Sequence, residues 1–258
     1  MSANNIFVKS DARPALEIPD KLDEYLIDIA GRFSRHKYLA GATQGVYKSQ
    51  IAMLEAYTQS VYGSIGGAKI LDWGAGKGHI SYLLKQQGFD VTSCDLDCEA
   101  FDSPFTQEIP IIDENNIDLV PLKHDYVLPF EDNSFDVVVS FGVLEHVGND
   151  FESMKEIKRI LKPGGAFFFF FLPFWLSWSQ RLAHLRGDYY HSRLYRLTDF
   201  KSMSERAGFD VGQIWHGQLF PKNGFGFNKG AEKLDRFLTN HTPFKYFATN
   251  LEGYLIAK

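Results

Sequence analysis

The stretch ILDWGAGKGH at residues 70–79 decides the fold of this chain. Two apolar residues lead into Asp72, and glycines then occupy every second position from Gly74 to Gly78. Glycine adopts backbone angles that other residues avoid, and it lets a ligand approach the bare main chain. The amides that open the following helix favour negative charge. The stretch therefore predicts a strand that turns into a helix and holds a small polar or anionic cofactor at the carboxyl end of a sheet.

A second strand is predicted over residues 89–97, where apolar and polar residues alternate before the acids at its end. Asp95 lies roughly 20 residues beyond the glycines, where dinucleotide-type folds place the acid that accepts hydrogen bonds from ribose hydroxyls. Asp97 is the competing candidate. Because Asp95 directly follows the apolar stretch, it is the predicted ribose ligand, and Asp97 is expected in a solvated loop.

Residues 133–147 and 166–172 hold two further, largely apolar runs, the second with five consecutive phenylalanines. A strand that is apolar on both faces belongs in the middle of a parallel sheet. Between the two runs, Asn149 and Glu152 form a capping-box-like helix start. Apolar residues then recur at helical spacing until the segment KPGG at residues 162–165 ends the helix. The sequence therefore predicts a strand, a helix and a buried strand in this order.

In their order and spacing, these segments resemble class I S-adenosylmethionine-dependent methyltransferases of the type 11 subgroup, which includes ubiquinone-biosynthesis O-methyltransferases. The glycine pattern D-x-G-x-G-x-G differs from the dinucleotide fingerprint G-x-G-x-x-G, which disfavours a nicotinamide-dependent oxidoreductase. The resemblance covers residues 70–172 well and the tail to residue 258 more loosely. It implies an α/β fold, a Rossmann-like three-layer sandwich with a mostly parallel seven-stranded sheet whose last strand is antiparallel. It also implies S-adenosylmethionine as the cofactor.

The resemblance assigns several residues to this cofactor. Asp125 is followed by an L-P-F segment and matches the acid that accepts a hydrogen bond from the adenine amine. Phe141 belongs to the strand that passes under the methionine part of the cofactor. The complete set of predicted cofactor-binding residues is Asp72, Gly74, Ala75, Gly76, Gly78, Asp95, Leu96, Asp125, Tyr126 and Phe141.

His146 is the predicted catalytic base, because it follows the strand that should lie near the methyl group. A histidine titrates near neutral pH, and the matching subgroup also carries Glu-His at this position. A histidine that only packs at a helix entry is the alternative. Glu145 is expected in a structural hydrogen bond. The predicted activity is methyl transfer to a small molecule, at oxygen.

Segments outside the central motifs are expected to cover the sheet. Residues 1–62 are predicted to form a helical cap, with one helix from about residue 20 and another over residues 49–62. Residues 1–258 as a whole are expected to form a single methyltransferase domain. The predicted elements of the tail are a helix capped by Thr198 and two strands, over residues 198–207, 209–215 and 246–257.

Residues 173–197 combine aromatic side chains with several arginines and are predicted to form a substrate lid inserted after the phenylalanine strand. Arg186 and Arg193 are expected to meet a carboxylate, phosphate or sugar group of the acceptor, with Tyr190 stacked beside it. A cover that only packs on the domain is the alternative, since arginine stems also cover apolar surface.

No metal ion is predicted. His184, Asp188 and His191 could in principle form a site, but paired histidines on a lid are commonly just polar surface. Cys94 and Cys98 lie near the end of the second predicted strand and lack the further ligands that a metal site needs. A disulfide between them is not expected in a cytoplasmic chain.

Composition bounds the remaining alternatives. The 258 residues are 45% apolar and 23% charged, which is ordinary for a soluble domain. The net charge of −5 argues against a nucleic-acid partner, because nonspecific nucleic-acid binders usually show a basic face. The polar first residues predict no signal peptide, and no apolar stretch reaches the roughly 18 residues that span a bilayer, so a cytoplasmic enzyme is expected. The alternatives are a noncatalytic S-adenosylmethionine-binding protein and a methyltransferase that acts on protein or nucleic acid.

Overall fold

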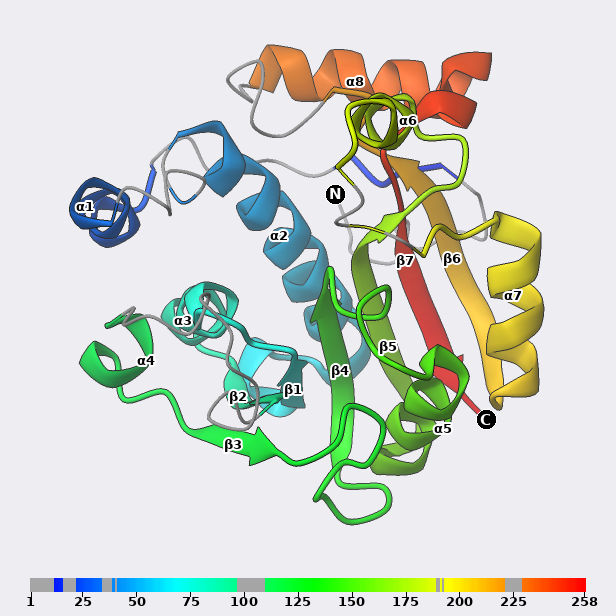
Figure 1. Cartoon of the computed structure of the whole chain (residues 1–258). Coiled ribbons are helices and arrows are strands. Elements are labelled where there is room, and N and C mark those ends of the chain that lie inside the picture. Colours follow the sequence, from blue (N-terminus) through cyan, green and yellow to red (C-terminus); the bar gives the residue numbers. More distant parts are fainter. Residues whose placement is uncertain are drawn as a thin grey trace.

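The computed structural model describes residues 12–15, 22–33, 39, 41–96, 110–188, 191, 193–220 and 229–258. Within these residues, one seven-stranded sheet runs through the molecule in the order β3-β2-β1-β4-β5-β7-β6 (Figure 1). Neighbouring strands from β3 to β5 pair in parallel, whereas β7 pairs antiparallel with both β5 and β6. The predicted sheet, parallel except for its last strand, is confirmed. The strands are β1 (Lys69–Trp73), β2 (Asp90–Leu96), β3 (Leu119–Leu122), β4 (Phe135–Phe141), β5 (Leu161–Pro173), β6 (Phe209–Gly217) and β7 (Asn250–Ala257).

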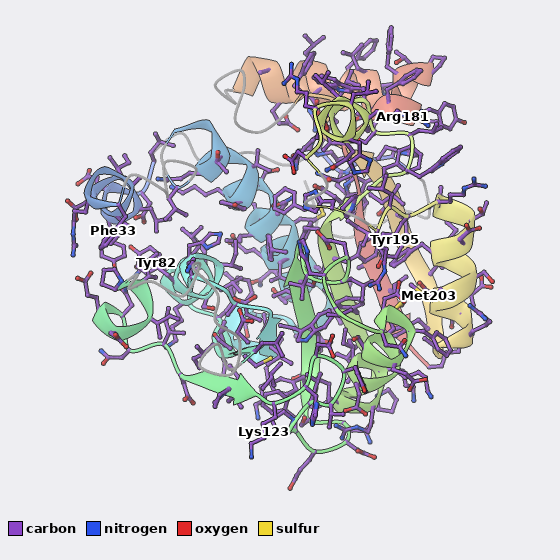
Figure 2. The ribbon with its side chains drawn as sticks, viewed as in Figure 1. Phe33, Tyr82, Lys123, Arg181, Tyr195 and Met203 are labelled. Atoms are coloured by element: carbon purple, nitrogen blue, oxygen red, sulfur yellow. The ribbon has the colours of Figure 1, made fainter. Side chains whose placement is uncertain are left out.

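Helices cover both faces of this sheet, which confirms the three-layer sandwich (Figure 1). One buried apolar cluster, with Tyr82 inside it and Phe33 packed against it, joins α1, α2 and α3 to the first face (Figure 2). A second cluster, with Tyr195 and Met203, joins α5 and α7 to the other face. Two more helices, α6 and α8, lie at the end of the sheet to which the arrows of β4 and β6 point. The helices are α1 (Glu24–Arg32), α2 (Ala42–Tyr62), α3 (His79–Gln86), α4 (Ile111–Glu114), α5 (Asp150–Ile160), α6 (Trp178–Leu185), α7 (Leu197–Arg206) and α8 (Lys229–His241).

The phenylalanine run in β5 contributes to both layers. Successive side chains of a strand point to opposite faces, so Phe167 and Phe169 lie in the second cluster, while Phe168 and Phe170 lie in the first. All four are at most 1% exposed. Phe171 interrupts this alternation, because its φ of +62° lies in the left-handed region and the register between β5 and β7 shifts at this point.

Side-chain caps explain where two of the helices begin. Asp23 accepts a hydrogen bond from the backbone N–H of Leu26 (3.0 Å) at the start of α1. Asn149 accepts one from the backbone N–H of Glu152 (3.2 Å) at the start of α5, as its spacing predicts. The second N-terminal helix, α2, begins at Ala42 and is therefore longer than its apolar spacing indicates.

Several predictions for the second half of the chain are wrong in detail. α7 begins after Arg196, and the Thr198 hydroxyl donates to Asp199 (3.1 Å) instead of capping the helix. β7 begins at Asn250, because the preceding residues Pro243–Phe247 form a 3₁₀ helix, η5. The sequence patterns predict neither α6 nor α8, although Ser177 caps α6 by accepting from the N–H of Gln180 (3.2 Å).

Some predictions fall on residues that the structure does not describe, namely Asp97, Cys98 and Tyr190. Cys94 is a buried free thiol. Across the described part of the chain, no helix combines the length and the apolar character needed to cross a membrane.

Candidate functional site

Three glycines with left-handed backbone angles build the turn between β1 and α3. The angle φ is +77° at Gly74, +52° at Gly76 and +78° at Gly78, values that residues with a Cβ disfavour. A Cβ at Gly74 would overlap the side chain of Val143, whereas a Cβ at Gly76 would meet nothing closer than Asp95 Oδ2, 3.9 Å away. Gly74 therefore permits close packing, and Gly76 leaves the main chain open toward a ligand.

This turn forms part of the wall of a cavity of about 330 Å³ at the carboxyl ends of β1, β2 and β4. The predicted site residues in its wall are Gly74, Ala75, Gly76, Asp95, Leu96, Asp125, Phe141 and His146. The wall also contains residues that the sequence patterns did not single out for the site, namely Trp73, Lys77, His79, Ile80, Leu122, Gly142, Val143 and Val147. Apolar side chains and two carboxylates thus share one cavity, which suits a ligand with a flat apolar part and several hydrogen-bond donors.

Asp95 is held in place by main-chain donors. Its Oδ2 accepts a hydrogen bond from the N–H of Gly76, and its Oδ1 accepts one from the N–H of Leu96 (2.7 Å). Burial raises the pKa of Asp95, and these two backbone donors partly offset that rise. A carboxylate has about four lone-pair sites, so both oxygens can still accept hydrogen bonds from a ligand in the cavity.

Asp72 and Gly78 do not line the cavity. Asp72 is 1% exposed and accepts a hydrogen bond from the Ser81 hydroxyl (2.6 Å), which in turn accepts one from Ser93 (2.9 Å). Burial, together with the nearby charge of Asp95, raises the pKa of Asp72 to about 7. Asp72 therefore supports the glycine turn from within the protein, because its hydrogen bond with Ser81 connects β1 to α3.

Asp125 connects two loops at the edge of the cavity. Its side chain accepts a hydrogen bond from the N–H of Gly148, and its carbonyl oxygen accepts one from the Ser153 hydroxyl (3.2 Å). The loop that follows β3 is thereby held against the start of α5. Its neighbour Tyr126 is 41% exposed and does not line the cavity.

His79 is a cavity residue that the sequence patterns miss. It opens α3 directly after Gly78, and its ring lies 4.9 Å from the ring of Tyr47 in α2. The ring of Tyr47 also lies 6.4 Å from that of Phe141. A polar residue directly after the last glycine of the turn is a signal that could have indicated His79.

Glu145 and His146 lie in the turn after β4. The backbone N–H of His146 donates to the carbonyl of Val143 (2.9 Å), and the imidazole lines the cavity. Burial lowers the pKa of His146, and the positive charge of Arg193 lowers it further. The side chain of Glu145 is 1% exposed, and its Oε1 lies 3.8 Å from His146 Nε2. Glu145 is thus a buried carboxylate directly behind the predicted base.

Arg193 makes most of its contacts with the main chain of this same turn. Its Nη1 donates to the carbonyls of Leu144 (3.2 Å) and Val147 (2.7 Å), and its Nη2 donates to that of Gly148 (3.4 Å). The hydroxyl of Tyr195 also donates to Leu144 O (3.1 Å). The segment after α6 is therefore held on the turn that carries His146, as the alternative of a packing cover predicts for Arg193.

The other predicted lid residues are placed differently. Arg186 is exposed at the C-terminal end of α6. Among the described residues, the structure brings His191 together with Glu145 and His146, rather than with Asp188 as a potential metal ligand. His184 Nε2 lies 3.1 Å from the backbone carbonyl oxygen of His191.

Comparisons with known proteins support the fold and the glycine turn. Residues 71–169 match a family model described as a methyltransferase domain. The ubiquinone biosynthesis O-methyltransferase of Rickettsia bellii is 36% identical over 107 residues, which cover 42% of this chain and 43% of that protein. A protein of the same name from Idiomarina loihiensis is 27% identical over 187 residues, or 68% of this chain and 74% of that protein. The chain therefore spans less than half the length of the first of these relatives.

Solved structures show the same fold over nearly the whole chain. The complex of the Haloferax volcanii Trm112 methyltransferase activator with a methyltransferase matches with a TM-score of 0.54 at 16% identity, over 93% of this chain and 99% of that one. A SAM-dependent methyltransferase from Thermotoga maritima matches with a TM-score of 0.54 at 17% identity, over 90% of this chain and 99% of that one. The glycine turn, the order of the strands and the folds of these structures agree with the methyltransferase domain that the family model matches over residues 71–169.

Proposed function

We propose that this chain binds S-adenosylmethionine and methylates a small molecule, at oxygen. The observation that carries the proposal is the composition of one cavity, in which Gly76, Asp95 and Phe141 share a wall with His146. Cofactor residues and a proton acceptor thus face the same space. The domain family and the relatives named as O-methyltransferases support the reaction class.

The residues of the cavity fit this cofactor. The carboxylate of Asp95 can accept hydrogen bonds from a ribose diol, and charge strengthens such bonds. Asp125 can accept from an adenine amine, while Leu96 and Phe141 offer apolar contact to the ring and the methionine chain. The open main chain at Gly76 permits close approach. When bound, the cofactor supplies a methyl group on a sulfonium, which an acceptor atom in line with it can displace.

His146 is the residue that we propose for proton removal. Its pKa lies below the usual value, so the imidazole is neutral at pH 7 and can accept the proton of an acceptor hydroxyl. A positioned general base contributes about 10²–10⁴-fold to the rate, and holding donor and acceptor in line contributes up to roughly 7–11 kcal/mol. Alignment is therefore the larger contribution, and His146 adds to it.

The segment 173–197 is the part that we propose to cover the acceptor. Arg186 is exposed and can meet a carboxylate, phosphate or sugar group. Arg193 is already bonded to main-chain carbonyls, so its contact with an acceptor would be made by the remaining N–H groups. Tyr190 completes the proposed acceptor contacts and lies outside the described residues.

The test is a search for turnover. The purified chain is incubated with isotopically labelled S-adenosylmethionine and a metabolite extract, and mass spectrometry follows labelled products and S-adenosylhomocysteine. Calorimetry with S-adenosylmethionine and with NAD is run alongside. Binding of the first without any labelled product would favour a noncatalytic binding protein, and binding of NAD alone would contradict the proposal.

A further inference from the structure

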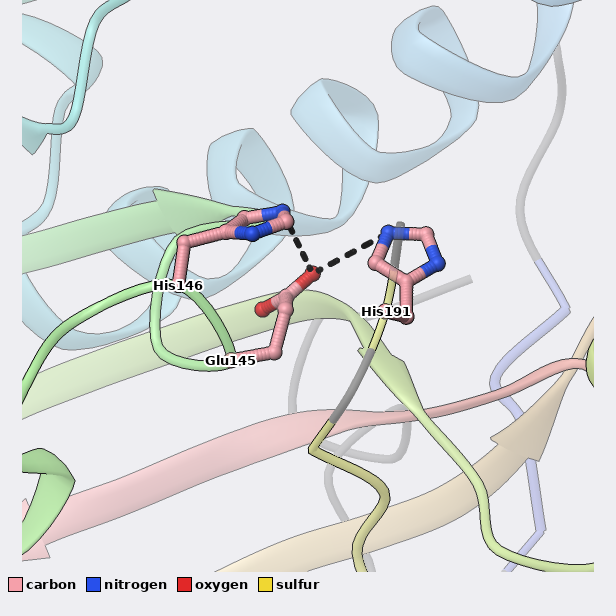
Figure 3. Close-up of side chains that lie close together, drawn as sticks. All are labelled: Glu145, His146 and His191. Atoms are coloured by element: carbon pink, nitrogen blue, oxygen red, sulfur yellow. Dashed lines mark ion pairs between the residues drawn. The ribbon is translucent and has the colours of Figure 1, made fainter. Parts of the chain in front are cut away.

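The side chains of Glu145, His146 and His191 meet in one small cluster, although they come from two segments far apart in the sequence. Glu145 Oε1 lies 3.8 Å from His146 Nε2 and 3.9 Å from His191 Nε2. Figure 3 shows this one carboxylate oxygen between the two imidazoles, whose ring centres are 5.4 Å apart. Glu145 and His146 belong to the turn after β4, whereas His191 follows α6. His191 therefore reaches the proposed base from outside residues 71–169, which match the methyltransferase domain.

Hydrogen bonds from α6 determine how His191 faces Glu145. The side-chain amide nitrogen of Gln180 lies 2.9 Å from His191 Nδ1, and an amide NH₂ group donates hydrogen bonds. His191 Nδ1 is therefore the acceptor, so the neutral ring carries its proton on Nε2, the atom directed at Glu145. His184 Nε2, 3.1 Å from the His191 carbonyl oxygen, adds a second contact from α6. Together these contacts present an N–H group of His191 to the carboxylate.

The main chain near His191 is also held on the turn that carries the proposed base. Two positions further along, Arg193 Nη1 donates to the carbonyl oxygens of Leu144 (3.2 Å) and Val147 (2.7 Å). These two carbonyls flank the Glu-His pair in the sequence. His191 is thus kept close to the carboxylate by hydrogen bonds on both of its sides in the chain, from α6 and from Arg193.

Proton transfer to His146 creates a charge that Glu145 can compensate. As the acceptor oxygen bonds to the methyl carbon, the carbon–sulfur bond breaks, its electron pair stays on sulfur, and the hydroxyl proton moves to the imidazole. The positive charge then resides on His146, where burial and the charge of Arg193 disfavour it, as its lowered pKa shows. The Glu145 side chain is 1% exposed, and an opposite charge within about 4–6 Å favours the charged form of a group. Glu145 therefore stabilises the imidazolium against both effects.

We infer that His191 is a positioning residue for proton removal: it holds the Glu145 carboxylate toward His146, so that His146 keeps its proton on Nε2 and accepts the hydroxyl proton on Nδ1. This role rests on the proposed function, because it concerns the same reaction at the same site. The separations of 3.8 and 3.9 Å exceed hydrogen-bond length, and catalytic contacts often shorten when the substrate binds. The segment 173–197 then aligns the proposed base as well as covering the acceptor.

The first experiment observes the His146 ring by NMR, without an acceptor. The full chain is labelled with ¹⁵N-histidine, and His146→Ala identifies the resonances of that ring. We expect neutral His146 to carry its proton on Nε2, and Glu145→Gln to lower the pKa of His146 by about 1. His191→Ala should reduce the fraction of neutral His146 protonated on Nε2, and His191→Gln, which keeps a side-chain donor, should restore it. Glu131→Gln, at an exposed acid before the other end of β4, should change neither quantity.

The second experiment measures turnover with the acceptor identified in the product search. Glu145→Gln and His191→Ala should each lower kcat by at least about tenfold, as part of the about 10²–10⁴-fold that a general base contributes, and should leave S-adenosylmethionine affinity unchanged. In the His146→Ala background, neither change should lower kcat further by more than about twofold, because residues that act as a unit are not additive. Damage to the fold would multiply the two losses instead.

Two results would overturn the role of His191: folded Glu145→Gln and His191→Ala variants in which the pKa and the tautomer of His146 are unchanged, or losses of kcat that multiply with that of His146→Ala. Circular dichroism checks folding, and if Glu145→Gln unfolds, His191, whose side chain is 25% exposed, decides alone. A chain that transfers no methyl group contradicts the proposed function, and the NMR experiment then decides by itself whether Glu145 and His191 position His146.

Discussion

The cavity has two ends that are built in different ways. At the glycine turn, main-chain groups within 20 positions of Gly76 position Asp95, through the N–H groups of Gly76 and Leu96. At the His146 end, side chains from distant segments meet, since Arg193 and His191 contact a turn about 45 positions earlier. A site built from main-chain groups that are close in the sequence tolerates few substitutions, but the spacing of its residues in the sequence can predict it. A site made of distant side chains can change its chemistry by single substitutions.

The largest expected effect is at the His146 end. His146→Ala removes the proposed base, so turnover should fall by about 10²–10⁴-fold, while affinity for S-adenosylmethionine stays close to wild type. Steady-state kinetics with the identified acceptor, together with calorimetry, measures both. His241→Ala serves as a histidine control on α8. A loss below tenfold would show that this end of the cavity works by shape and alignment rather than by a proton acceptor.

The next largest effect is on the free energy of unfolding, and it comes from Asp72, which lies beneath the glycine turn. The pKa of Asp72 is about 7 in the folded chain and near 3.8 when exposed, so between these values the folded state retains a proton that the unfolded state has lost. The free energy of unfolding therefore falls as pH rises from about 4 to 7, and the full penalty remains above pH 7. Asp72→Asn does not titrate. Relative to wild type, its stability should improve by roughly 2–4 kcal/mol between pH 4 and pH 8.

Urea unfolding of both proteins at a series of pH values measures this difference. Other carboxylates titrate in both proteins, so only the difference between the two curves is informative. A flat difference would mean that Asp72 is ionised in the folded chain at all these pH values, and that the support below the turn is a charge rather than a neutral hydrogen-bonded acid.

A smaller effect is expected for the ribose contact. Asp95→Ala should weaken S-adenosylmethionine binding by about 1.5–3 kcal/mol, the loss expected for hydrogen bonds to a charged group. Asp90→Ala, an exposed acid at the other end of β2, should bind normally. Calorimetry on the two variants tests the main-chain end of the cavity. Wild-type affinity in Asp95→Ala would remove Asp95 from the cofactor site.

The smallest effects distinguish two arginines of the 173–197 segment. Arg193→Met removes three hydrogen bonds to carbonyls of the His146 turn and should lower the free energy of unfolding by about 1–3 kcal/mol. Arg186→Met, at an exposed position, should stay within about 0.5 kcal/mol of wild type and raise the Michaelis constant of the acceptor. Denaturation and kinetics on this pair separate a structural cover from an acceptor-binding lid. Equal stability of both variants would contradict the structural role described for the hydrogen bonds of Arg193.

Sequence patterns predicted the central sheet because each strand carries its own signal. The alternation in β2, the apolar run of β4 and the Asn149 cap are all local, and burial on one or both faces follows from them. α6 was missed although Ser177, Trp178 and Leu182 carry a cap and helical spacing, because the aromatic and arginine content of that segment indicated a loop over a substrate. The start of β7 was misplaced for a similar reason, since η5 is as apolar as a strand.

The residues of the candidate site divide in the same way, into those with a local sequence signal and those without one. Asp95 and the glycines could be predicted, because their geometry depends on neighbours in the chain. Asp72 was predicted to contact the cofactor, but the structure places it beneath the glycine turn. Residue spacing does not show how deeply Asp72 is buried, and this depth separates a residue that lines the cavity from one that supports the turn. The contact of His191 with Glu145 could not be predicted, because no periodicity relates two loops that meet only after the chain has folded.

Asp72, under the glycine turn, has its pKa raised to about 7 and so lies close to the pH at which the proposed cofactor would bind. Asp72 and Asp95 each raise their affinity for protons through burial, and the charge of Asp95 acts on Asp72. S-adenosylmethionine carries a net positive charge, and a positive charge nearby lowers the pKa of an acid. Cofactor arrival at near-neutral pH should therefore expel part of a proton into the solvent, and departure of the neutralised product should draw it back. This linkage should make the relative affinities of the chain for S-adenosylmethionine and for its demethylated product depend on the pH of the solution, even before any acceptor is bound.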